Sequence, residues 1–208
     1  ADMGGIGYIS YHFAESAHNN VLISTHMLEA SRINQVSKFF FPSSACVYPQ
    51  ALQSDPNVTA LKEDDAHPAD PDEGYGWEKL FSEIITHYFD KDFGIDHRIC
   101  RFHNVYGPYG TWQGGREKAP AALCRKIIEA KRSGKHVIEI WGDGEQTRSF
   151  MYIDDCITGM EKIWSSGYTE PLNLGSSEMV SINQLIDIIS GIAGITVERQ
   201  YDLTKPQG

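Results

Sequence analysis

Segments with a helical hydrophobic period alternate along this chain with short apolar runs, and this alternation constrains the fold more than any other feature. Strands separated by helices of about 10–17 residues form βαβ units with a parallel sheet. The sequence therefore predicts an α/β fold. We expect helices over 19–35, 76–91, 118–132, 154–164 and 182–192, and strands over 38–41, 97–102, 136–141, 149–153 and 172–174.

Two of the expected helices carry predictions of which side chains face inward. In the helix over 19–35, Asn19 and Asn20 precede the apolar period as candidate caps. The predicted buried stripe of that helix consists of Val21, Leu22, Leu28 and Ile33. In the helix over 76–91, the predicted stripe consists of Leu80, Ile84 and Tyr88, with Phe81 and Ile85 beside them.

Composition excludes several classes of protein. The chain has 28 acidic and 18 basic residues, a net charge of −10, which argues against a general nucleic-acid binder. It has no apolar run of the ~18 residues that a membrane span needs, and no signal segment opens it. The spacing of Cys46, Cys100, Cys124 and Cys156 matches no metal site, so we expect free thiols in a reducing cytoplasm and no bound metal.

The charges are unevenly distributed. Residues 54–73 hold seven acids and one lysine, which predicts a solvated loop. Residues 112–135 hold seven lysines and arginines against two glutamates. That basic segment is either a solvated helix face or the place where a small anionic ligand binds.

Polar clusters follow three of the expected strands, at residues 43–46, 103–104 and 147–148. Ligands of parallel α/β sheets gather at the carboxyl ends of the strands, so these clusters predict one binding edge. Cys46 within the first cluster is either a small buried side chain or a thiol that exchanges protons. His103 after the second strand is more typical of a structural histidine.

Tyr75 and Lys79 lie four residues apart, on one face of an expected helix. An ammonium close to a phenol favours the phenolate, so this pair predicts a base that removes the proton of a sugar or steroid alcohol during hydride transfer. Tyr201 and Lys205 have the same spacing, but a proline follows them immediately. The chain also contains Gly5-Ile6-Gly7, which lacks the third glycine and the preceding strand of a dinucleotide-binding loop.

Several blocks together resemble the extended short-chain dehydrogenase/reductase enzymes that act on nucleotide sugars. These blocks are Ser43-Ser44, the Tyr75-x-x-x-Lys79 pair, Arg101 to Pro108 and Trp141 to Phe150. Three further features resemble the GDP-mannose 3,5-epimerases within that family. They are Ala1-Asp2-Met3-Gly4-Gly5, Cys46 after Ser-Ser-Ala, and the loop from Gly114 to Ala122.

The resemblance implies a Rossmann-like doubly wound parallel sheet with a smaller α/β substrate-binding domain. Residues 1–110 would form the later part of the NAD-binding domain. Residues 111–208 would form mostly the GDP-sugar domain, with segments near 145–175 returning to the first. The family's glycine-rich NAD loop and first strands would precede residue 1. We therefore expect a fragment that is inactive and binds NAD poorly when isolated.

The implied reaction is an NAD-dependent epimerisation of a GDP-sugar at carbons 3 and 5. Tyr75 would be the base for oxidation at carbon 4, with Lys79 steadying its phenolate and Ser44 bonding the reacting oxygen. Ser43, Tyr75 and Lys79 would contact NAD. The resulting ketone acidifies the neighbouring carbons, where Cys46 and Lys118 would exchange protons before NADH returns its hydride.

The resemblance also implies the residues that contact the substrate: Gly4, Asn104, Glu117, Lys126, Gln146 and Arg148. Lys126 and Arg148 suit a diphosphate, because charged donors bind phosphate strongly. The resemblance also implies a homodimer formed through the helices over 19–35 and 76–91. Two alternatives stay open. The chain is either another nucleotide-sugar epimerase or reductase in which Cys46 is merely packed, or a non-catalytic nucleotide-sugar-binding protein.

Overall fold

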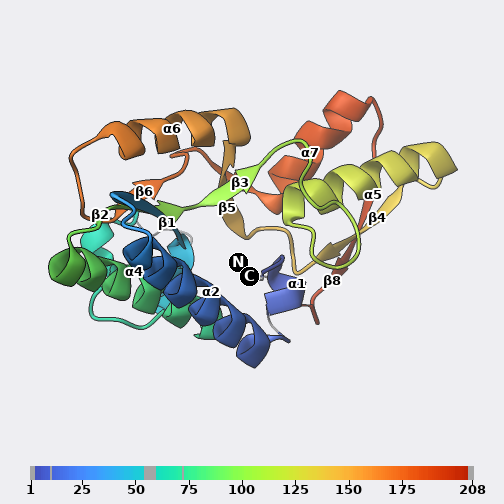
Figure 1. Ribbon diagram of the computed structural model, residues 1–208. Helices are drawn as coiled ribbons and strands as arrows, with labels where there is room; N and C mark the ends of the chain where they lie inside the picture. The colour runs from blue at the N-terminus through green and yellow to red at the C-terminus, as the bar shows by residue number, and fades with distance from the viewer. Residues whose placement is uncertain (1–2, 10, 54–59, 72, 206–208) are drawn as a thin grey trace. The chain divides into compact units, whose positions relative to one another are not determined.

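The computed structural model describes residues 3–9, 11–53, 60–71 and 73–205, and the chain divides into two compact units (Figure 1). Among the described residues, unit 1 comprises those within His12–Val105 and Met151–Ser176. Unit 2 consists of Met3–Tyr11, Tyr106–Phe150 and Ser177–Gly208. The assignment of a cofactor role and a substrate role to different parts of the chain stays a prediction.

Unit 1 is built on a parallel sheet with the strand order β1-β2-β6. The strands are β1 (Lys38–Ser44), β2 (Asp96–Phe102) and β6 (Leu172–Leu174). The register runs from Lys38 opposite Asp96 to Ser44 opposite Phe102, so the two long strands end together. Helix α4 (Glu73–Phe93) contacts β1 and β2 from one side of the sheet, while α6 (Ile153–Ser165) contacts β2 from the other (Figure 1). The predicted α/β class with parallel strands is confirmed.

Helix α2 (Phe13–Ile33) packs along α4, but the predicted buried stripe of α2 is largely wrong. Leu28 is buried as predicted, but the other buried positions are Ser16, Asn20, Ser24 and Ser31. Leu22 and Ile33 are 40% and 64% exposed. Close approach explains the small residues, because a Cβ on Gly74 of α4 would lie 3.1 Å from the Phe13 carbonyl oxygen. The helix also begins at Phe13, so Asn19 and Asn20 are interior residues and not caps.

The buried face of α4 is polar, which the apolar period did not predict. Leu80 is buried as expected, whereas Phe81, Ile84 and Tyr88 are 46%, 40% and 55% exposed. A buried polar group is costly unless it is paired, and several of these have partners within unit 1. The buried face consists of Tyr75, Gly76, Glu78, Lys79, Leu80, Ser82, Glu83 and Thr86.

Short elements complete unit 1 above the carboxyl end of β1. They are η1 (Ala45–Val47), α3 (Gln50–Gln53) and η2 (Glu63–Ala66). Val47, Tyr48, Ala66 and Leu80 form a small apolar cluster that ties them to α4. Of the expected acidic loop over 54–73, residues 54–59 and 72 lie outside the described residues. In the described part, Glu63 is not simply solvated, because its carboxylate accepts a hydrogen bond from the Asn173 amide at 2.8 Å.

Unit 2 has an aliphatic core. Strand β4 (Val137–Trp141) pairs in parallel with β8 (Glu198–Asp202), and α5 (Ala119–Ser133) packs against β4 and α7 (Ile182–Ala193). Strand β5 (Thr147–Tyr152) pairs antiparallel with β7 (Met179–Ser181). The buried core residues are Leu123, Ile127, Ala130, Ile138, Ile140, Ile182 and Ile186.

The remaining described elements are α1 (Ile6–Ile9) and β3 (Asn104–Tyr106). Helices α5, α6 and α7 follow the expected ranges within a few residues, whereas β7 and β8 were not predicted. Within the part of the chain that the structure describes, no helix is long and apolar enough to cross a membrane.

Candidate active site

Three of the predicted catalytic residues come together in unit 1, where the first turn of α4 meets η1. The Ser44 hydroxyl accepts a hydrogen bond from the Cys46 amide at 3.2 Å and so caps the short η1 turn. A Cβ on Gly76 would lie 2.3 Å from the Cys46 carbonyl oxygen, so only glycine allows α4 to come this close. Tyr75, next to that glycine, is buried and interacts with both Ser44 and Cys46.

Lys79 lies one turn further along α4 and is also buried. Its ammonium nitrogen Nζ donates a hydrogen bond to the Pro42 carbonyl oxygen at 3.0 Å, which holds it at the end of β1. Nζ lies 5.6 Å from the centre of the Tyr75 ring and 5.0 Å from that of Phe41. The predicted Tyr75/Lys79 pair is therefore a structural pair on one helix face, joined to the strand that carries Ser44.

The protonation of this pair differs from the expectation that Lys79 favours a Tyr75 phenolate. Burial raises the pKa of Tyr75 well above its usual range, the charges of Cys46 and Glu78 raise it further, and the hydrogen bond with Ser44 opposes them. Burial also lowers the pKa of Lys79, against the charges of Glu78, Glu83 and Cys46. Tyr75 is thus a neutral phenol here because desolvation outweighs the hydrogen bond with Ser44.

Ser43 faces a buried ion pair that the sequence reading did not identify. The Arg101 Nη2 lies 2.7 Å from Oε2 of Glu83, its Nε donates to Oε1 at 3.0 Å, and the Ser43 hydroxyl donates to the same carboxylate. Ser43 and Arg101 are register partners on β1 and β2. The ion pair therefore ties the carboxyl ends of both strands to α4, next to the catalytic candidates. The predicted contact of Ser43 with NAD stays a prediction.

A groove runs along unit 1 beside the catalytic candidates. It is lined by Phe39 to Pro42 of β1, by Lys79, and by the α2 residues Asn20, Ile23, Ser24 and Met27. Apolar walls with an ammonium between them suit a flat ring attached to a hydroxylated sugar. The hydrogen bond to Pro42 uses one of the three protons that a lysine ammonium can donate.

Glu78 is a second site residue that sequence reasoning missed. It lies between Tyr75 and Lys79 in the chain, its side chain is 1% exposed, and Oε1 is 4.0 Å from Nζ of Lys79. Burial raises the pKa of Glu78 to about 7, although Lys79 and Asn20 favour its charged form. The only sequence signal was its position inside the Tyr-x-x-x-Lys spacing.

In unit 2, the segment with Gly4 and Gly5 lies against the glycine-rich loop. The Gly5 amide donates to the Arg116 carbonyl at 3.1 Å, and a Cβ on Gly5 would lie 2.4 Å from the Glu117 carbonyl oxygen. The Arg116 guanidinium lies 4.0 Å from the centre of the Tyr8 ring and donates to its hydroxyl at 2.9 Å. Two segments that the resemblance singled out separately thus form one structure.

The predicted substrate contacts of unit 2 already make hydrogen bonds within the protein. Oε1 of Glu117 accepts from Arg125 at 3.1 Å, and Nζ of Lys126 donates to the Glu139 carbonyl at 2.6 Å. Burial lowers the pKa of Lys126. Gln146 donates to the Trp141 carbonyl at 3.1 Å, while its own Oε1 is buried without a hydrogen-bond partner among the described residues.

The other predicted residues occupy different environments. Lys118 stands at the N-cap position of α5, is exposed and makes no capping hydrogen bond through its side chain. Arg148 is half-buried on β5 and donates to the Thr147 carbonyl at 2.6 Å. Gly4 is buried in unit 2, and Asn104 is half-buried at the start of β3 in unit 1. Their roles toward a substrate stay predictions.

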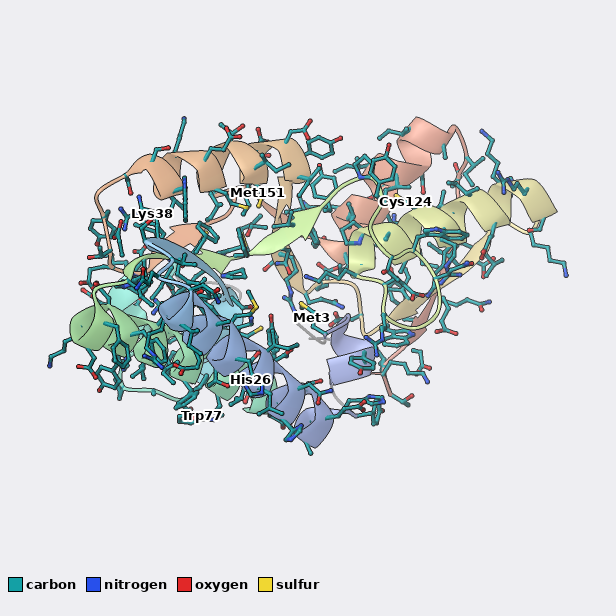
Figure 2. The ribbon with its side chains drawn as sticks, in the orientation of Figure 1. Met3, His26, Lys38, Trp77, Cys124 and Met151 are labelled. Carbon is teal, nitrogen blue, oxygen red and sulfur yellow. The ribbon has the colours of Figure 1, made fainter. Side chains whose placement is uncertain are left out.

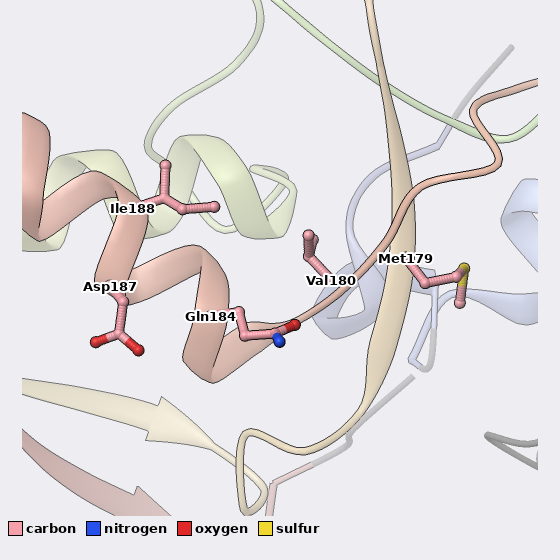
Figure 3. A pocket seen from close by; sticks show the side chains of 5 residues that line it. All are labelled: Met179, Val180, Gln184, Asp187 and Ile188. Carbon is pink, nitrogen blue, oxygen red and sulfur yellow. The ribbon is translucent and has the colours of Figure 1, made fainter.

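A separate depression on unit 2 contains none of the predicted residues. It is lined by Met179 and Val180 of β7 and by Gln184, Asp187 and Ile188 of α7. Figure 3 shows these side chains spread along the two elements and not converging on one point. We assign no chemistry to it.

Comparison with known protein families gives a match over residues 3–175 to the NAD dependent epimerase/dehydratase family. Among curated proteins, the chain is 52% identical over 189 residues to GDP-mannose 3,5-epimerase 1 of Oryza sativa subsp. indica. That match covers 91% of this chain and 49% of the rice protein. The chain thus spans about half the length of the curated relatives it matches.

Solved structures of sugar-nucleotide epimerases have the same fold. UDP-glucose 4-epimerase of Thermotoga maritima with UDP-glucose is 25% identical with a TM-score of 0.82, covering 99% of this chain and 64% of that one. UDP-glucuronic acid 4-epimerase of Bacillus cereus, in complex with UDP-glucuronic acid and NAD, is 30% identical with a TM-score of 0.68, covering 88% and 54%. The predicted Rossmann-like parallel sheet is confirmed.

Proposed function

The chain belongs to the NAD dependent epimerase/dehydratase family, and from this premise we propose that its full-length protein inverts carbons 3 and 5 of GDP-mannose through transient oxidation at carbon 4. The observation that carries the proposal is the cluster in unit 1, where a cysteine lies beside the Ser44/Tyr75/Lys79 group. The 52% identity to a GDP-mannose 3,5-epimerase supports the choice of sugar.

The residues of unit 1 fit NAD. The groove between α2 and β1 offers apolar walls, and the buried Lys79 ammonium in it keeps donors for ribose hydroxyls. Lys79, Tyr75 and Ser43 would hold the cofactor, which supplies a hydride acceptor that later returns the hydride. Unit 1 would thus serve the cofactor and unit 2 the GDP-sugar.

Tyr75 and Ser44 would handle the proton of the carbon 4 hydroxyl. Ser44 interacts with Tyr75 and is fixed by the η1 turn, so its hydroxyl is positioned to bond the reacting oxygen. Tyr75 would accept the hydroxyl proton when the alcohol becomes a ketone, and Lys79 would balance the phenolate charge beforehand. Tyr75 and Lys79 are buried and Ser44 is half-buried, which would limit the access of water to this exchange.

Cys46 would exchange protons at a carbon next to the ketone. Its sulfur belongs to a half-buried free thiol, and its backbone is fixed against Gly76. The family resemblance assigns Lys118 to the second proton, delivered from the opposite face of the sugar. Lys118 lies in the other unit, so its assignment depends on the sequence alone.

Unit 2 would recognise the nucleotide diphosphate and sugar. Lys126 and Arg148 are cations held by backbone carbonyls, and charge-assisted donors of this kind bind phosphate strongly. Gln146 has a buried acceptor that a ligand hydroxyl or amide could satisfy. We propose further contacts from Gly4, Glu117 and Asn104.

We also propose that the full-length protein is a cytoplasmic homodimer formed through α2 and α4. The support is the exposed apolar face of the helix pair, on which Trp77 is 50% exposed (Figure 2). Further exposed apolar residues on these helices, outside the groove, are Leu22, Phe81, Ile84 and Tyr88. The four cysteines are free, a state that the cytoplasm maintains. Sedimentation velocity of wild type and Phe81→Glu tests the dimer, which the glutamate would split.

Incubation of the full-length protein with GDP-mannose and NAD in deuterated water tests the reaction. We expect deuterium at carbons 3 and 5 of the product. Cys46→Ala would remove exchange at one carbon at least and preserve oxidation at carbon 4, while Tyr75→Phe would slow turnover by about 10²–10⁴-fold. Product without label would reject the double epimerisation and favour an epimerase or reductase in which Cys46 is merely packed.

A further inference from the structure

Glu78 is the buried charged group of unit 1 that the proposed chemistry leaves without a role. Its side chain is 1% exposed, and neither carboxylate oxygen has a hydrogen-bond partner of good geometry among the described residues. The nearest charged partner of the carboxylate among the described residues is the Lys79 ammonium at 4.0 Å. A buried carboxylate paired at so long a distance is costly in proteins, so its place inside the Tyr75/Lys79 spacing calls for a physical reason.

Among the side chains that act on Glu78, the cation is Lys79. Glu83 also acts on Lys79, but its carboxylate is already neutralised by Arg101 at 2.7 Å. From α2, the group that acts on Glu78 is the uncharged amide of Asn20. The η1 turn contributes the Cys46 thiol, which acts on Tyr75 and Lys79.

One ammonium thus faces two candidate anions in a buried site. A Glu78 carboxylate places its oxygen 4.0 Å from the Lys79 nitrogen, and a Tyr75 phenolate would need the same positive charge. Like charges that share a desolvated site do not ionise together, as in paired carboxylates. The direction is visible in this structure, because the charge of Glu78 raises the pKa of Tyr75.

We propose that Glu78 is a positioning residue that controls Tyr75 through Lys79: the phenolate forms only when Glu78 carries a proton. In reaching that state the Tyr75 hydroxyl loses one proton and a Glu78 oxygen gains one. An O–H bond breaks and another forms, no electron moves, and the net charge of the three groups is unchanged. This inference rests on the proposed function, in which Tyr75 is the base.

The consequence is that Glu78 makes catalysis independent of pH above neutrality. The pKa of Glu78 is raised to about 7, so the residue is protonated below neutrality and ionised above it. Ionised Glu78 holds Lys79 and keeps Tyr75 protonated. Wild-type turnover should rise with pH up to neutrality and then level off, because above neutrality the active state and the resting state differ only in which of the two groups holds the shared proton.

The decisive variant is Glu78→Gln in the full-length protein, because a carboxamide imitates the protonated acid at every pH. We expect its rate of carbon 4 oxidation to match wild type near pH 6 and to exceed it by up to about tenfold for each pH unit above neutrality. Glu78→Asp, which keeps a carboxyl group, should restore the plateau above neutrality. Ser82→Ala, an equally buried change on the same helix, should leave the wild-type profile unchanged. Parallel profiles of wild type and Glu78→Gln would overturn the proposal.

A titration without substrate separates this inference from the proposed function. In chain labelled with ¹³C at glutamate carboxyls and tyrosine Cζ, one carboxyl should titrate near neutrality and be missing from Glu78→Gln. The Tyr75 signal should titrate at lower pH in that variant. A Glu78 carboxyl that titrates in the usual acidic range, or an unchanged Tyr75 signal, would reject the coupling. Coupling without any GDP-mannose turnover would reject the proposed function alone.

Discussion

The two units of this chain solve the problem of a stable interior in opposite ways. Unit 2 buries aliphatic side chains from α5, β4 and α7, and its charged residues remain near the surface. Unit 1 buries Glu78, Lys79, Glu83 and Arg101 along one helix face and a strand. Apolar burial stabilises without regard to orientation, whereas buried charges stabilise only in a fixed geometry. The unit with the costly interior is the one that contains Ser44, Cys46, Tyr75 and Lys79, all of the catalytic candidates except Lys118.

The largest effect should come from breaking the buried ion pair of unit 1. Arg101→Met leaves the Glu83 carboxylate uncompensated, and we expect a loss of about 3–5 kcal/mol in the free energy of unfolding, measured with urea. The double variant Arg101→Met/Glu83→Gln should recover part of the loss. If the single variant cost less than 1 kcal/mol, unit 1 would not depend on this ion pair.

The corresponding test in unit 2 is a substitution that creates a cavity in its aliphatic core. Ile186 is fully buried in the aliphatic core, so Ile186→Ala should cost about 2–5 kcal/mol by the same measurement. Ile186→Leu, which keeps the volume, should cost less than about 1.5 kcal/mol. Because this core is apolar, the loss in the free energy of unfolding caused by Ile186→Ala should not depend on the salt concentration. A loss that varied strongly with ionic strength would contradict an apolar origin.

The third prediction is that the free energy of unfolding depends on pH through a residue of unit 1 and not through the core of unit 2. Glu78 has a pKa of about 7 in the folded chain, against 4.5 ordinarily, so between these values the folded state binds a proton that the unfolded chain releases. The free energy of unfolding should therefore fall by up to about 3 kcal/mol as pH rises from 4.5 to above 7. Glu78→Gln should remove this slope, and Ile186→Ala should preserve it. A slope that survives Glu78→Gln would assign the effect to another group.

The smallest effect should come from the ion pairs of unit 2. Arg125 reaches Glu117 at 3.1 Å and Glu129 at 3.3 Å, but the pairs are partly exposed. We expect Arg125→Met to change the free energy of unfolding by less than about 1 kcal/mol. Thermal unfolding at low and high salt would check this. A loss as large as that of Arg101→Met would remove the distinction between the units.

The sequence predicted unit 2 better where hydrophobic period and burial agree. Helix α5 was expected over 118–132 and runs from Ala119 to Ser133, because its Leu123, Ile127 and Ala130 follow a helical period and face the core. Strand β8 was not predicted, because it pairs with β4 while its side chains stay mostly exposed. A strand that pairs through its backbone while its side chains stay exposed has no alternation of apolar and polar residues, so the sequence does not predict it.

In unit 1 the short motifs predicted which residues lie together, whereas the hydrophobic period of the helices predicted the wrong buried faces. The spacing of Tyr75 and Lys79 and the Ser43-Ser44 cluster predicted which residues meet, since both depend on local geometry and on strand ends. Helix α2 buries serines because it lies so close to α4, and no one-dimensional hydrophobic pattern contains that distance. The same approach buries Glu78, which explains why its role emerges only in three dimensions.

Gly76 carries a consequence for anyone who wishes to redesign this enzyme family. Because no side chain atom fits between Gly76 and the Cys46 carbonyl, the cysteine turn and the tyrosine helix are mechanically coupled. A change that shifts the helix must carry the turn with it, or else open a gap there. Substitutions that aim to change the substrate range should therefore be made in unit 2, and the backbone that positions Cys46 and Tyr75 should be left unchanged.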